Sequence, residues 1–177
     1  MQDWSTEAGD ELVSALARER QAFEALLFRL LSARHLLTTA SARFLSWAAS
    51  DLERAYEQLR EAELRRASVV AATGAKLGEG EVTLRALIQR APEPYGAVLD
   101  DHRQAIGRLA AEVAASAEAA NELARRDRER LGPPSADPEA DDDMVAALEV
   151  ELARCGYDAI IAATLPLTLP SLTTFLA

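Results

Sequence analysis

Cysteine, aromatic residues and basic residues are all scarce in this sequence. Cys155 is the only cysteine among 177 residues, which excludes an internal disulfide and favours a reducing compartment. Aromatic residues make up 5% of the chain and hydrophobic residues 49%, so Leu, Val and Ala must form most of the core. The 19 Lys and Arg residues are outnumbered by 29 Asp and Glu residues, giving a net charge of −10. This balance argues against nucleic-acid binding, which needs clustered basic side chains.

Sequence signals for secretion and for catalysis are also missing. Met1–Ser5 has neither a basic start nor an apolar stretch, so we expect no signal peptide and a cytoplasmic protein. Helical-bundle enzymes often carry Glu-x-x-His pairs, but Ser32 stands three residues before His35. Leu99 stands three residues before His102, so the motif is absent there too, and we expect His102 to be a hydrogen-bonded core residue. With neither a phosphate-binding loop nor a paired-cysteine motif, we expect no enzyme activity, no metal and no cofactor.

Glycine and proline are absent between Gly9 and Gly74, a stretch rich in Ala, Leu, Glu and Arg. Such a composition predicts long helices. Apolar residues recur there every seven positions, so they share one helix face that must pack on another helix. One row is Leu16, Phe23, Leu30, Leu37 and Phe44, and a second is Leu45, Leu52 and Leu59. The phase slips near Thr38–Ser41, which favours a reversal of the chain over one bent helix. Arg65-Arg66 is expected on a solvated face, because carboxylates surround it.

A third long helix is predicted after Pro94 and should run to about Leu131. Before it, Thr83 is expected to cap a short connecting helix that Pro92 ends. The apolar row of the third helix is Leu99, Ile106, Val113 and Ala120. Each long segment holds roughly thirty residues, or about 45 Å of helix. We therefore predict an all-α fold, an antiparallel three-helix bundle of long coiled-coil-like helices.

The C-terminal part of the chain differs in composition from this bundle. Gly132–Pro138 has the composition of a linker, and the 22 residues from Gly132 to Ala153 include seven acidic residues and no basic one. One face of a following amphipathic helix is formed by Val145, Leu148, Leu152 and Cys155, with Cys155 as a small buried hydrophobe. Gly156 is expected to end that helix. The sequence thus predicts a bundle at 1–131, an acidic Pro-rich linker at 132–143, and an amphipathic helix with an apolar tail at 144–177.

The last nineteen residues after Asp158 carry no charged side chain. Their number approaches that of a membrane span. Pro166 and Pro170 interrupt any helix there, however, and no basic cluster flanks the segment. We expect the tail to pack on the bundle or to dock on a partner.

Several local motifs follow one another in the long-helix region. They are Ala17-Arg18-Glu19-Arg20 ahead of Phe23, Asp51-Leu52-Glu53-Arg54-Ala55, Glu61-Ala62-Glu63-Leu64-Arg65-Arg66-Ala67, Val82-Thr83-Leu84-Arg85-Ala86-Leu87-Ile88 with Ala91-Pro92-Glu93-Pro94, and Asn121 with Leu123. With these motifs, residues 11 to 131 resemble the FlgN family of flagellar export chaperones. The resemblance implies a protein that binds hook-filament junction proteins in the cytoplasm, keeps them unassembled and hands them to the flagellar export machinery. It also implies cargo binding through the C-terminal helical region, although the Pro-containing sequence after Gly156 departs from the family pattern.

We expect the partner surface on this C-terminal segment, because its apolar side chains must be covered by the bundle or by cargo. The candidate residues are Val145, Leu148, Leu152, Tyr157, Ile160 and Ile161. Tyr157 weakly resembles the tyrosine that flagellar chaperones tend to carry near the C-terminus for contact with the export gate. Apart from contact through that gate, we expect no membrane contact. The alternative is a coiled-coil adaptor or a self-associating structural protein, since a Leu and Phe seam can also pack on a second copy. We expect mainly a monomer and leave a dimer open.

Overall fold

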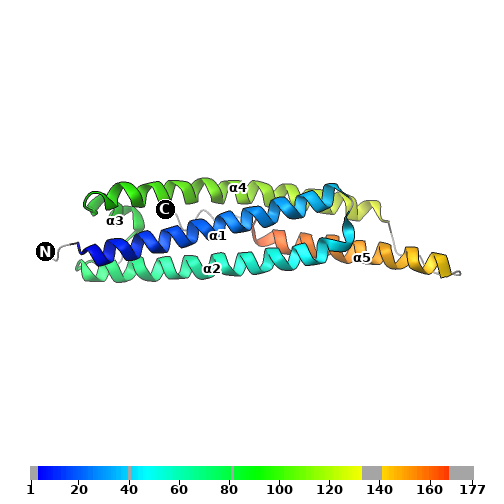
Figure 1. Ribbon diagram of the computed structural model, residues 1–177, viewed down its shortest axis with the longest axis horizontal. Coiled ribbons are helices and arrows are strands. Elements are labelled where there is room, and N and C mark those ends of the chain that lie inside the picture. The colour runs from blue at the N-terminus through cyan, green and yellow to red at the C-terminus, as the bar shows by residue number, and fades with distance from the viewer. Residues whose placement is uncertain (1–3, 40, 81, 133–140, 168–177) are drawn as a thin grey trace. The chain divides into compact units, whose positions relative to one another are not determined.

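The computed structural model describes residues 4–39, 41–80, 82–132 and 141–167, with the side chains of 141–143 excepted. Over these residues the regular elements are all helical (Figure 1). The elements in chain order are α1 (Thr6–Thr38), the 3₁₀ turn η1 (Ala42–Phe44), α2 (Leu45–Lys76), α3 (Leu84–Arg90), α4 (Tyr95–Arg130), α5 (Asp141–Thr164) and the 3₁₀ turn η2 (Leu165–Leu167). The predicted all-α fold of long packed helices is confirmed.

The chain reverses between α1 and α2, as the phase slip predicted. Thr38 and Thr39 each donate a hydroxyl hydrogen bond of 2.9 Å to the carbonyl of His35. The same carbonyl accepts a 3.0 Å hydrogen bond from the amide of Thr39, so backbone and hydroxyl donors converge on it where α1 ends. The short helix α3 begins as predicted, because the Thr83 hydroxyl accepts a 3.2 Å hydrogen bond from the amide of Ala86.

The described chain forms two compact units, and α1, α2 and α4 each contribute a segment to both. Of the described residues, unit 1 contains 4–26, 55–80 and 82–112 and includes α3. Unit 2 contains 27–39, 41–54, 113–132 and 141–167 and includes α5. The predicted division at 131/132 and 143/144 stays a prediction, because residues 133–140 and 168–177 lie outside the described residues.

In unit 1 the first part of α1 contacts both α2 and α4. An ion pair joins Glu11 to Lys76 and another joins Glu19 to Arg66, so α1 and α2 are antiparallel. The Tyr95 hydroxyl at the start of α4 donates a 2.8 Å hydrogen bond to Asp10 in the first turns of α1, as parallel helices require. The largest fully buried side chains of this unit are Leu12, Leu16, Phe23, Leu26, Leu59, Leu87, Leu99 and Ile106.

Unit 2 contains four helical segments, because α5 packs antiparallel to α4. Arg128 of α4 pairs with Asp158 of α5 at 3.0 Å, whereas Asn121, nearer the start of α4, bonds the later Thr164. The buried apolar residues of this unit include Leu30, Leu37, Leu45, Leu52, Val113, Ala120, Tyr157, Ile160 and Leu167. From the three predicted apolar rows, Leu30, Leu52, Leu59, Ile106 and Val113 are all fully buried, each within its own unit.

Three local expectations are wrong. Helix α5 does not end at Gly156 but continues to Thr164. A Cβ on Gly156 would lie 2.8 Å from the Cβ of Leu45, so the glycine allows close helix packing instead of stopping the helix. Cys155 is exposed, because the neighbouring Gly156 faces the core. His102 is only half-buried, and its Nδ1 has no hydrogen-bond partner among the described residues.

Candidate partner-binding surfaces

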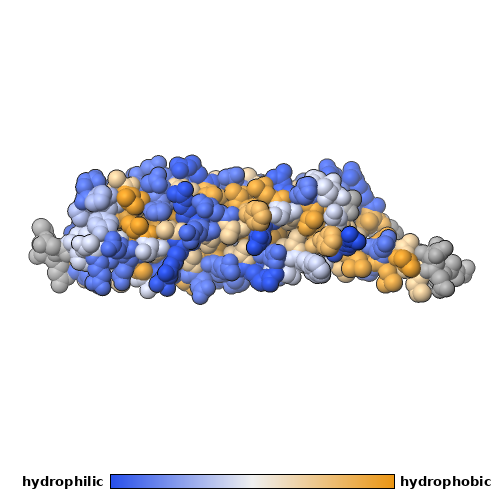
Figure 2. All heavy atoms as spheres, in the orientation of Figure 1, coloured by the Kyte–Doolittle hydropathy of each residue, from blue (hydrophilic) through white to orange (hydrophobic). Residues whose placement is uncertain are grey.

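The six predicted partner residues fall into two groups along α5. Val145, Leu148 and Leu152 are between 54% and 60% exposed. Tyr157 and Ile160 are buried, and Ile161 is half-buried. Figure 2 shows apolar atoms at the surface of the part of the view where Figure 1 places α5. The bundle therefore covers the C-terminal half of α5 and leaves the apolar side chains of its N-terminal half in water.

The position of Gly156 explains where this division falls. A Cβ built on Gly156 would lie 3.1 Å from the carbonyl oxygen of Ala42, so this part of α5 lies beside the α1–α2 turn. Arg154 donates a 3.1 Å hydrogen bond to the carbonyl of Gly132, just after the end of α4. Residues before 153 consequently extend past both the turn and the described end of α4. Residues 144–152 are all exposed except the half-buried Ala147, and we call residues 141–152 the projecting half of α5.

The projecting half is acidic as well as apolar. Its sequence contains five Asp and Glu residues and no Lys or Arg. Met144 and Val150 add to the exposed apolar surface. Such a helix suits a partner that presents an apolar stripe flanked by basic side chains.

The buried half of α5 is held to α4 by a polar network inside unit 2. The side-chain amide of Asn121 donates hydrogen bonds of 2.9 Å to Thr164 and 3.2 Å to the carbonyl of Ile161. Its oxygen accepts a 2.7 Å hydrogen bond from Arg125. The Thr164 hydroxyl in turn donates a 2.8 Å hydrogen bond to the carbonyl of Ile160. Each of these polar groups is therefore satisfied, and the network fixes the base from which the projecting half extends.

Burial also affects Tyr157, which lies in this anchored half. Desolvation raises the pKa of the Tyr157 phenol, and the nearby Asp127 carboxylate raises it further. The phenol thus stays neutral at physiological pH. In this arrangement Tyr157 packs in the core and does not offer its ring to a partner.

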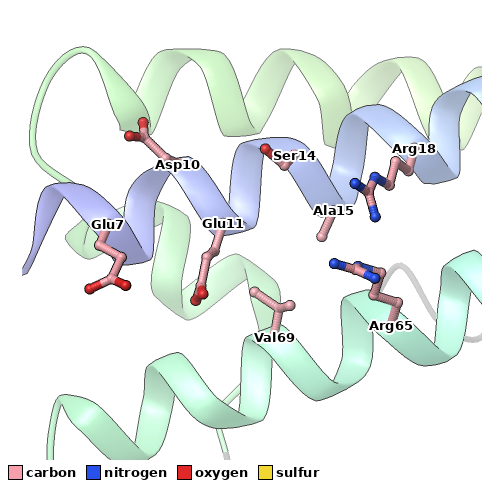
Figure 3. A pocket seen from close by; sticks show the side chains of 8 residues that line it. All are labelled: Glu7, Asp10, Glu11, Ser14, Ala15, Arg18, Arg65 and Val69. Atoms are coloured by element: carbon pink, nitrogen blue, oxygen red, sulfur yellow. The ribbon is translucent and has the colours of Figure 1, made fainter.

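A second candidate surface is a groove between α1 and α2 in unit 1, with a volume of about 630 Å³ (Figure 3). Glu7, Asp10 and Glu11 line one end, and Arg18 and Arg65 line the other. In Figure 3 the guanidinium groups of the two arginines point toward each other across the groove, and neither forms an ion pair with a described residue. Sequence reasoning missed this groove because the residues of its two walls, one on α1 and one on α2, stand more than forty positions apart in the sequence.

Beside Arg65, the next residue in α2 is buried. Arg66 forms an ion pair with Glu19 of α1 at 2.6 Å, and the two side chains are 6% and 2% exposed. The expected solvated face therefore holds for Arg65 but is wrong for Arg66. Burial raises the pKa of the Glu19 carboxyl, the Arg66 guanidinium lowers it, and the Glu63 carboxylate raises it. The net direction is upward, so desolvation outweighs the attraction of the arginine.

Comparison with known proteins bears on both surfaces. The family model described as FlgN protein matches residues 1–132. The chain belongs to the FlgN family. Proteins of this family are in general cytoplasmic chaperones of flagellar export and are not known as enzymes. The searches of curated proteins and of solved structures each gave no match.

For this FlgN-family chain, the matched range includes α1 to α4 and ends before α5. The groove between α1 and α2 thus lies inside the matched range, whereas all six predicted partner residues lie beyond it. Across the described segments, no helix has both the length and the apolar character needed to cross a membrane.

Proposed function

We propose that this export chaperone binds hook-filament junction proteins through the projecting half of α5. Bound in this way, the cargo stays unassembled in the cytoplasm until the chaperone delivers it to the flagellar export apparatus. The observation that carries the proposal is the exposed apolar face of Val145, Leu148 and Leu152, on the half of α5 whose described side chains the bundle leaves uncovered. Tyr157, Ile160 and Ile161 anchor this helix and take part in binding indirectly.

The size of the exposed face sets the affinity that it can supply. Burying a whole Leu or Val side chain contributes about 1.5–3 kcal/mol. Since the three side chains are a little over half exposed, covering them contributes roughly 3 kcal/mol, equivalent to about a hundredfold in affinity. The acidic side chains around them add selectivity for a cargo helix with basic flanks.

Point substitutions test the proposal better than deletion of the segment. Deleting residues 133–177 would also remove Tyr157, Ile160 and Leu167 from the core of unit 2. The variant with Leu148→Asp and Leu152→Asp should instead keep its melting temperature, because both side chains are exposed. Its affinity for the terminal helical region of a hook-filament junction protein should fall about a hundredfold by isothermal titration calorimetry.

A matched control is Leu64→Asp, at an exposed leucine of α2 in unit 1, which should leave the affinity unchanged. Equal affinity in the α5 variant and the parent would place the cargo surface elsewhere, with the α1–α2 groove as the next candidate.

A further inference from the structure

The groove between α1 and α2 in unit 1 continues beyond the part shown in Figure 3. Arg18 and Arg65 also line a second hollow of about 570 Å³, which follows the same two helices as far as Ala25. Every residue that lines the two hollows belongs to α1 or α2. Between Glu7 and Ala25 the groove follows α1 for 18 residues, or about 27 Å at 1.5 Å per residue. Its length therefore matches about five turns of a helix.

Small side chains line the middle of this groove. Ala15 is buried, and Figure 3 shows its methyl group pointing toward α2. Ala22 of α1 and Ala62 of α2 line the second hollow and are half-buried. The distance between packed helices depends on the side chains at their contact, so alanines let a third helix come close to both walls. The groove can therefore receive a helix along its length.

Charges of alternating sign follow one another along the groove, about seven residues apart. Glu11 lines its first end, and Arg18 stands seven residues later in α1. Arg65 of α2 lies opposite Arg18, and Figure 3 shows their guanidinium groups pointing toward each other. Glu61 lines the second hollow together with Ala25, which stands seven residues after Arg18. The order along the groove is thus acidic, basic and acidic.

Few of these charges have a partner among the described residues. Arg18, Arg65 and Glu61 form no ion pair there, and Glu11 contacts Lys76 at 3.8 Å, with both side chains half exposed. Two guanidinium groups that face each other repel, so a carboxylate between them is favourable, and both can donate hydrogen bonds to it. An acidic side chain from another molecule therefore fits the centre of the groove.

We propose that this groove is a docking site for an amphipathic helix of another protein, with a basic, an acidic and a basic residue at successive intervals of seven. Residues seven apart share one face of a helix, so all three charges reach the groove together. The central carboxylate binds Arg18 and Arg65, and the flanking cations bind Glu11 and Glu61. The order of charges is the same in both chain directions, so either direction of the docked helix satisfies it. The site shares no residue with the projecting half of α5 and does not depend on the cargo surface proposed there.

Two synthetic peptides test this charge pattern. The first is an Ala- and Leu-rich amphipathic helix of about 20 residues with Lys, Glu and Lys at intervals of about seven, and the second has its central Glu replaced by Lys. The parent protein should bind the first peptide at least about tenfold more tightly by isothermal titration calorimetry, although its net charge of −10 favours the second. The variant that combines Arg18→Glu and Arg65→Glu should prefer the second peptide by a similar factor, because the centre of its groove is then acidic.

Three further variants separate docking in the groove from other effects. Arg85→Glu with Arg108→Glu changes the net charge equally at exposed positions of α3 and α4, and it should bind the first peptide as the parent does. Leu148→Asp with Leu152→Asp, the variant that tests the cargo surface, should also bind it as the parent does. Ala25→Trp, at an exposed position of the groove, should weaken binding about tenfold, because the indole fills the second hollow. Circular dichroism melts show whether each variant is folded.

A parent protein that does not bind the first peptide would overturn the inference, as would a folded Arg18→Glu and Arg65→Glu variant that keeps the parent's preference. Equal loss of binding in the Arg85→Glu and Arg108→Glu control would also overturn it, because net charge alone would then explain the effect. Inorganic phosphate that binds the parent as tightly as the peptide would show a simple anion site instead of helix docking. If the peptide binds as expected but the α5 variant keeps its cargo affinity, the docking site stands and the proposed cargo surface fails.

Discussion

Removal of Arg66 alone should destabilise the protein far more than removal of Arg66 and Glu19 together. The two side chains form an ion pair at 2.6 Å inside unit 1 and are almost completely buried. The variant Arg66→Met keeps an unbranched apolar chain at this position but leaves the Glu19 carboxyl without its counter-charge. The double variant Glu19→Leu with Arg66→Met removes both charges and retains similar apolar volumes.

Two estimates give the loss of unfolding free energy expected for Arg66→Met. Removing one partner of a buried pair costs about 3–5 kcal/mol, because an uncompensated charge remains. Glu19 can avoid that charge by taking up a proton, which from a normal pKa of 4.5 costs about 3 kcal/mol at pH 7. Protonation is the cheaper route, so we expect a loss of about 3 kcal/mol at pH 7. The double variant should lie within about 1 kcal/mol of the parent or be more stable.

The raised pKa of Glu19 determines how the stability of the folded protein changes with pH. Burial raises the pKa of Glu19 above its usual 4.5, so the folded protein binds a proton at pH values where the unfolded chain does not. The resulting stabilisation is fully present below about 4.5 and is lost as the pH rises through the folded-state pKa. Without Arg66 the upward shift grows. The stability of Arg66→Met should therefore increase by about 1.4 kcal/mol for each pH unit lowered from 7 toward 5.

Urea unfolding followed by circular dichroism at pH 5, 6 and 7 measures this effect. The double variant is the reference, since it also lacks Arg66 and differs from Arg66→Met only at Glu19. Their difference in unfolding free energy isolates the titration of Glu19 from that of Glu63 and of the surface. Equal stabilities of the two variants at pH 7, or a difference that does not change with pH, would refute the buried pair.

Two further substitutions test unit 2. Leu52→Asp should cost several kcal/mol in thermal unfolding, because it buries an unpaired charge at a wholly covered position of α2. Asn121→Ala should cost about 1–3 kcal/mol, since Thr164 and the Ile161 carbonyl lose a donor. Hydrogen exchange should show its largest increase in the C-terminal half of α5.

The three long helices could be predicted from the sequence because their signals are local. A stretch without glycine or proline, with apolar residues every seven positions, specifies a helix and its buried face without knowledge of its neighbours. The reversal near Thr38 was also predictable, since the phase of the apolar rows changes there. Thr83 marked the start of α3 through its own side chain.

Arg65 and Arg66 illustrate what remained unpredictable. The two residues have nearly the same chemistry and stand side by side in the sequence, yet one is exposed and the other buried. Successive residues of a helix point about 100° apart, and only the position of Glu19, 47 residues earlier, makes the buried site tolerable for a charge. The extent of the candidate partner face was unpredictable for the same reason, because it depends on distant packing. Amphipathicity identified α5, but the packing of Gly156 beside the turn decided which half stays exposed.

Gly156 also provides a test of that packing. Replacing a glycine inside a helix by alanine ordinarily stabilises by about 1 kcal/mol. Here the added methyl group would lie 2.8 Å from the Leu45 Cβ and 3.1 Å from the Ala42 carbonyl oxygen, neither of which can move without its backbone. Overpacking of this kind costs about 1–3 kcal/mol and outweighs the propensity gain. We therefore expect Gly156→Ala to lower the melting temperature, whereas Cys155→Ala at the exposed neighbouring position should leave it unchanged. If Gly156→Ala raised the melting temperature, α5 would not lie against the α1–α2 turn, and the division into an anchored and a projecting half would be lost.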